Sequence, residues 1–109
     1  MTPDRILANL KAYVDAIRDS AQVDIDAYVA RIASGDATAH CAESLARAID
    51  ERAAAAQAQG ILGALGEADD AKVVRPALAS IVHAGLGESG PSNARRDLAR
   101  VALRALAAV

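Results

Sequence analysis

The sequence contains very few aromatic residues and very little sulfur. Its 109 residues include no Phe or Trp, two Tyr, one Met and one Cys. A single cysteine excludes both a disulfide and a cysteine-based metal cluster within one chain. No apolar run reaches the roughly 18 to 20 residues that a membrane-spanning helix needs, and the N-terminus lacks a signal-like pattern. We therefore expect a protein of the reducing cytoplasm that does not enter a membrane.

The chain also lacks a strong net charge. Its formal charge is −2 and its pI is near 5.6, so no global attraction draws it to nucleic acid or to an anionic membrane. The charge is unevenly placed, because residues 93–109 carry four basic groups and one acidic group. Arginine outnumbers lysine ten to two, a bias typical of GC-rich coding sequence, and this indicates a bacterial or phage origin.

Alanine is the most frequent residue and occupies 29 of the 109 positions. Alanine is the best helix former, because it loses no side-chain entropy on folding, but it buries little apolar area. The ten Leu, eight Val and seven Ile must supply most of the core, at roughly 1.5 to 3 kcal/mol for each fully buried side chain. We expect one domain over residues 1–109, with closely packed helices that leave surface for a second chain.

The first segment has the clearest helical pattern. Thr2, Pro3 and Asp4 favour a helix start, because a hydroxyl caps free N–H groups, proline needs no N–H bond there and an acid suits the positive dipole end. The apolar residues that follow recur at three- and four-residue steps and share one stripe. They are Ile6, Leu7, Leu10, Tyr13, Val14 and Ile17.

The end of this first helix is open to two interpretations. Three later apolar residues stay near the stripe, but Asp24 also falls inside it: they are Ile25, Tyr28 and Ile32. We favour one long helix that ends at Ser34-Gly35, where glycine suits the left-handed position after a helix. The alternative is a break near Ser20, with Asp19 or Ser20 capping a second helix.

Three further helices are expected. Asp36 or Thr38 caps the second helix, which frays toward Gly66. The third runs from about residues 68–70 to 86, and Pro76 either kinks or begins it. Ser92 or Asn93 caps the last. The inward residues predicted for the second helix are Ala42, Leu45, Ala46, Ile49, Ala53 and Ala56, and those for the third are Ala71, Val74, Leu78, Ile81 and Val82. The expected fold is an all-α, compact bundle of about four helices, and we expect it to be oligomeric.

Gly85, Gly87 and Gly90 match the spacing G-x-G-x-x-G of phosphate-binding turns. That turn requires a preceding strand within a βαβ unit, and no strand is predicted here. We therefore interpret the segment as a plain loop between helices.

His40 has acids at helical spacing, with Asp36 four residues before it and Glu43 three after. Such a group holds a metal only where a cavity gathers the ligands, and the helical wheel places His40 opposite Leu45 and Ile49, toward solvent. No metal, cofactor or catalytic residue is therefore predicted. Cys41 follows His40 but points about 100° away, so we expect a partly buried structural cysteine, with an intermolecular or redox role as the alternative.

His83 and Gly87 resemble, over about five residues, the phosphorylated segment of histidine phosphotransfer domains, which are four-helix bundles of similar size. Those domains continue their helix past the histidine, whereas Gly85, Gly90 and Pro91 interrupt it here. The resemblance implies a phosphorelay role for His83, or for His40, as a further alternative.

The last helix carries the most suggestive surface. Arg96, Arg100 and Arg104 repeat every four residues with Arg95 alongside, and Leu103 falls at the edge of this stripe. Guanidinium groups so spaced suit an acidic protein surface or the phosphates of a nucleic acid. A solvated face is the simpler interpretation.

The function predicted from the sequence is that of a small, non-enzymatic interaction module. It would act as a regulator, adaptor or inhibitor by docking on a partner protein, as a homodimer, through Arg95, Arg96, Arg100, Leu103 and Arg104. The alternative is nucleic-acid binding through the arginine stripe of the last helix.

Overall fold

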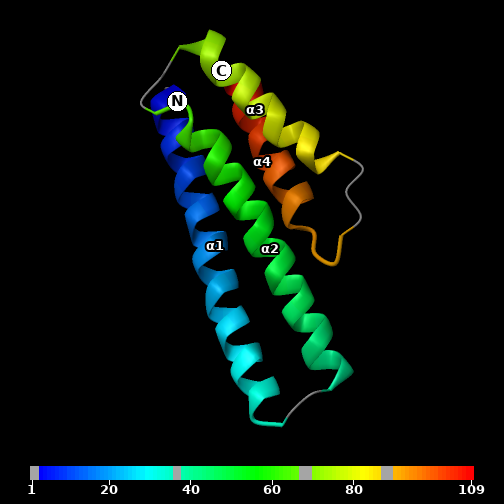
Figure 1. Ribbon diagram of the computed structural model, residues 1–109. Helices are drawn as coiled ribbons and strands as arrows, with labels where there is room; N and C mark the ends of the chain where they lie inside the picture. The colour runs from blue at the N-terminus through cyan, green and yellow to red at the C-terminus, as the bar shows by residue number, and fades with distance from the viewer. Residues whose placement is uncertain (1–2, 36–37, 67–69, 87–89) are drawn as a thin grey trace.

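The computed structural model describes residues 3–35, 38–66, 70–86 and 90–109. Four helices follow one another: α1 (Pro3–Ala33), α2 (Ala39–Gly63), α3 (Ala71–Gly85) and α4 (Ala94–Ala108). Each runs antiparallel to the one before it, and the short α3–α4 pair packs beside only one end of the long α1–α2 pair (Figure 1). These described ranges contain no strand, so the predicted all-α bundle of about four helices is confirmed.

α1 is a single helix of 31 residues, as preferred from the sequence. It passes through Asp19 and Ser20, both exposed, so the alternative of a break near Ser20 is wrong. The helix ends as expected, with Gly35 at a φ of 104°, which a residue with a side chain rarely adopts. The predicted cap Thr2 lies outside the described residues.

α1 and α2 pack through residues spaced seven apart, as in an antiparallel coiled coil. The buried residues of this seam are Leu7, Val14 and Ala21 on α1, and Cys41, Ala48, Ala55 and Leu62 on α2. The predicted inward face of α2 is therefore wrong: Leu45 is half-buried, Ile49 is 51% exposed, and the four alanines of that set are exposed. Bulk supplied by α1 lets the small residues Cys41, Ala48 and Ala55 form most of the α2 side of the seam, whereas Ile49 turns outward.

Local capping follows the sequence closely. The Thr38 hydroxyl accepts a hydrogen bond from the backbone N–H of Cys41 at 3.2 Å, and Asp70 caps α3 by accepting from the N–H of Lys72 at 2.9 Å. α2 continues through Gly60 to Gly63, and Pro76 lies inside α3 rather than at its start. Asp36, the other candidate cap of α2, lies outside the described residues.

α3 and α4 approach each other closely at Gly85. A Cβ atom placed on this glycine would lie 2.4 Å from the Cβ of Ala99 and 2.5 Å from the carbonyl oxygen of Arg95. Gly85 is thus the buried last residue of α3. The prediction from the sequence that Gly85 belongs to a loop is wrong. Of the inward residues predicted for α3, Val74, Leu78 and Ile81 are buried in the core. Ala71 is exposed and Val82 is half-buried. Gly87 lies outside the described residues.

Candidate interaction surfaces

The five predicted binding residues of α4 do not form one surface. The side chain of Arg95 is only 21% exposed and its Nη1 donates to Oδ1 of Asp50 at 2.6 Å. Arg96, Arg100 and Leu103 point into solvent, and Arg104 lines a hollow against α1. The structure therefore divides the predicted stripe between a structural ion pair, an outward face and an interhelical groove.

The ion pair of Arg95 joins the start of α4 to the middle of α2. The Ser92 hydroxyl donates to Oδ2 of Asp50 at 2.5 Å and accepts from the N–H of Ala94 at 3.3 Å. Burial raises the pKa of the Asp50 carboxyl, but the hydrogen bonds from Ser92 and Arg95 and the charge of Arg95 outweigh burial and hold this pKa below its usual value. The network fixes the position of α4 and occupies Asp50 and Arg95, so this arginine contributes to the fold.

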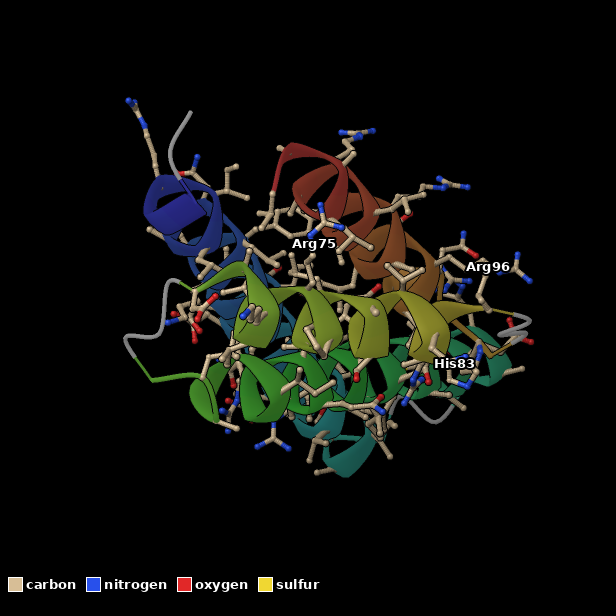
Figure 2. The ribbon with its side chains drawn as sticks, turned by 90° about the horizontal axis from the view of Figure 1, so that it is seen from above. Arg75, His83 and Arg96 are labelled. Carbon is tan, nitrogen blue, oxygen red and sulfur yellow. The ribbon has the colours of Figure 1, made fainter. Side chains whose placement is uncertain are left out.

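The outward face of α3 and α4 is basic and partly apolar. Arg75 reaches from α3 toward α4, while Arg96 extends outward near the first turn of α4 (Figure 2). Arg100 lies one turn after Arg96, with its side chain 72% exposed and paired to Asp97 at 3.5 Å. Leu103, three residues after Arg100 on α4, is 54% exposed. We call Arg75, Arg96, Arg100 and Leu103 the basic face.

The charge that gathers in this half of the molecule was only partly visible in the sequence. α3 and α4 together carry six basic residues and one acidic residue, a net charge of +5, whereas α1 and α2 together carry six basic and eight acidic residues, a net charge of −2. Lys72 and Arg75 contribute two of these charges, and in the sequence the acidic residues that flank α3 offset them. The charge of the helical positions alone is the signal that reveals the basic half.

A groove runs between α1 and α4 on another side of the bundle. Near the start of α1 it opens into an apolar hollow of about 450 Å³. The hollow is lined by Ile6, Asn9, Leu10, Tyr13, Val101, Arg104, Ala105 and Ala108. A second hollow of about 340 Å³ follows toward the first turn of α4 and is lined by Tyr13, Ala16, Ile17, Ser20, Glu51, Ala94 and Asp97. Tyr13 therefore stands between a basic and an acidic end of one groove.

The acidic end carries a poorly compensated carboxylate. The pKa of Glu51 is raised, first by burial and then by the negative charge of Asp24, against a smaller opposing effect of Arg47. Asp50 and Asp97 raise it further. A cation brought to this end of the groove would relieve that repulsion.

The remaining predicted candidates lie apart from one another. His40 is exposed in the first turn of α2, as expected, and His83 is exposed on the side of α3 away from α4 (Figure 2). Cys41 is fully buried, with its Sγ 4.0 Å from the carbonyl oxygen of Tyr28. Within the described ranges, no three His, Cys, Asp or Glu side chains gather into a group that could hold a metal ion.

Comparison with known proteins does not add a relative. No family model, curated protein or solved structure matches this chain. In the described part of the chain, no helix is both long and apolar enough to cross a bilayer. The surfaces themselves are therefore the basis for any functional assignment.

Proposed function

We propose that this chain is a protein-interaction module that docks an acidic partner protein on its basic face, acting as a regulator, adaptor or inhibitor rather than as an enzyme. The observation that carries the proposal is the set of three exposed arginines on α3 and α4, Arg75, Arg96 and Arg100, together with the exposed Leu103 on α4. We propose further that the working form is a homodimer in the cytoplasm.

The chemistry of this face suits a protein. Arginine forms bidentate bonds with carboxylates and is enriched at binding hot spots, where a neighbouring apolar side chain is removed from water. Leu103 offers such an apolar contact, and Leu86, which is 69% exposed at the end of α3, lies in the same half of the molecule. The +5 charge of α3 and α4 would speed encounter with an acidic partner, in a manner that salt suppresses.

The test compares two variants with the same loss of charge. The first removes three arginines of the basic face (R75A/R96A/R100A), and the control removes three exposed arginines of the long hairpin (R5A/R47A/R52A). Partners captured from lysate by the wild-type protein should be lost with the first variant and kept with the control, and the capture should weaken as salt rises. Equal capture by both variants, or none by the wild type, would refute the proposal.

Nucleic-acid binding is the second candidate, favoured by the same +5 charge of α3 and α4. Both tyrosines, Tyr13 and Tyr28, lie on α1, so the basic face has no aromatic ring for base stacking. A 20-base-pair duplex that binds at low salt, and loses binding in an R96A/R100A/R104A variant, would favour this candidate over protein docking.

A further inference from the structure

The groove between α1 and α4 is complementary to itself. Its floor runs along α1 from Ile6 to Ser20, a length of about 21 Å at 1.5 Å per residue, and is apolar in the first hollow and mixed in the second. Arg104 stands at one end, and Glu51 and Asp97 stand at the other. Tyr13, which is 40% exposed, lies between them.

We propose that a second copy of this chain covers the groove, in a two-fold dimer whose axis passes near Tyr13. A two-fold axis places the same patch of both copies face to face and reverses its direction. The basic end of one groove then lies over the acidic end of the other, so that Arg104 of each copy meets Asp97 and Glu51 of its partner. The same opposition occurs twice in each dimer.

Exposed apolar surface and the charges of the groove in a single chain both favour binding of a second copy. The exposed ring of Tyr13 and the hollow of about 450 Å³ beside it leave apolar surface in water, and its burial is the main favourable term in association. Near the axis, the two Tyr13 rings would pack against each other, and aromatic rings of this size are enriched in interface cores. The incoming Arg104 would also bring a positive charge to Glu51, whose pKa is raised by burial and by the negative charge of Asp24.

The charge pattern distinguishes a second copy from other occupants. An unrelated helix would need its own acidic and basic ends at the matching spacing, whereas a copy of this chain brings them by symmetry. Arg104 and Asp97 are seven residues apart on α4, about 10 Å along the axis; Arg104 lines the first hollow, Asp97 lines the second, and Tyr13 lines both. This proposal rests on the proposed function only for the homodimer, to which it assigns an interface. It is independent of the docking of an acidic partner, because Arg75 and Arg96 are not among the residues that line the groove.

The decisive experiment reverses one charge at each end of the groove. R104E and D97R are made separately, and the mass of each protein is measured by light scattering and sedimentation over a wide range of concentration. The wild type should have twice the chain mass of 11.1 kDa. Each variant alone places like charges together twice, and we expect its dimer dissociation constant to rise at least about tenfold.

The mixture of the two variants provides the test that a folding defect cannot imitate. In an R104E–D97R heterodimer both contacts again pair opposite charges, so mixing should restore the dimer. R96E is the matched control, since it makes the same charge change outside the groove, and it should remain dimeric. Circular dichroism confirms that each variant is as helical as the wild type.

Several outcomes would overturn the proposal. A wild type that stays monomeric at all concentrations excludes the dimer, and uptake of a small apolar dye by that monomer would show that the hollow takes a ligand instead. A dimer unaffected by R104E or D97R uses another face, and variants that fail to pair when mixed exclude this register. The R75A/R96A/R100A variant should still dimerise, so loss of an acidic partner and loss of self-association are separate results.

Discussion

A single added methyl group should have opposite effects at two glycines of this bundle. At Gly85 a new Cβ would meet the Cβ of Ala99 at 2.4 Å and the carbonyl oxygen of Arg95 at 2.5 Å. Carbon atoms in contact prefer about 3.5 to 4.0 Å, so α3 and α4 must separate by about 1 Å in a Gly85→Ala variant. At Gly60, inside α2, nothing lies within 4 Å of the corresponding Cβ position.

The magnitudes follow from these two environments. Overpacking of a tight contact costs about 1 to 3 kcal/mol, and the clash at Gly85 involves a backbone carbonyl that no side-chain rotation can relieve. We therefore expect Gly85→Ala to lower the free energy of unfolding by about 2 to 3 kcal/mol. Gly60→Ala should raise it by about 0.5 to 1 kcal/mol, because alanine loses less backbone entropy in a helix interior.

Thermal and urea unfolding, followed by circular dichroism at one fixed protein concentration, measure both changes. Since about 1 kcal/mol shifts the midpoint of a domain of this size by roughly 4 to 8 °C, Gly85→Ala should melt at least about 8 °C below the wild type. Gly60→Ala should melt a few degrees above it. Equal stabilisation by both substitutions would show that α3 and α4 are not in close contact at Gly85, and would refute the packing described here.

Two further predictions concern Asp50 and Cys41. The pKa of Asp50 is depressed, so its ion pair stabilises the fold above the unfolded value of about 3.9 and this contribution is lost as the pH falls through the lower, folded value. Asp50→Asn should therefore cost about 1 to 2 kcal/mol at pH 7, and in urea titrations its deficit should shrink below about pH 4; a constant deficit would contradict the network. The fully buried thiol of Cys41 should react with an excess of thiol reagent only as the protein opens, whereas immediate labelling of the native protein would contradict its burial.

Sequence periodicity was sufficient for the elements of this fold but not for all of their faces. The stripe of α1 contains branched and bulky residues, and its period identified Leu10 and Val14 as core residues. In α2, alanine is equally compatible with water and with the interior, so the two large residues Leu45 and Ile49 dominate the pattern and predict the wrong inward face. Which face of an alanine-rich helix turns inward depends on its partner, and a single helix does not carry that information.

The candidate surfaces show the same division. The exposure of Arg96 and Arg100 followed from the helical wheel of α4 alone. The pairing of Arg95 with Asp50 joins residues 45 positions apart in the chain, and the groove depends on how α1 meets α4. Contacts of this kind arise from tertiary packing, which local sequence patterns do not encode.

The unequal lengths of the two hairpins mean that cohesion varies along the molecule. α1 spans about 46 Å and α4 only about 22 Å at 1.5 Å per residue, so the far part of the long hairpin stands as a two-stranded arm. Its interior there is narrow, with Ala21, Ala48 and Cys41 as the buried residues. The two helices of this arm are held by small side chains, so they should separate more readily at the tip than at the four-helix end, and local opening of the tip should leave the four-helix end intact.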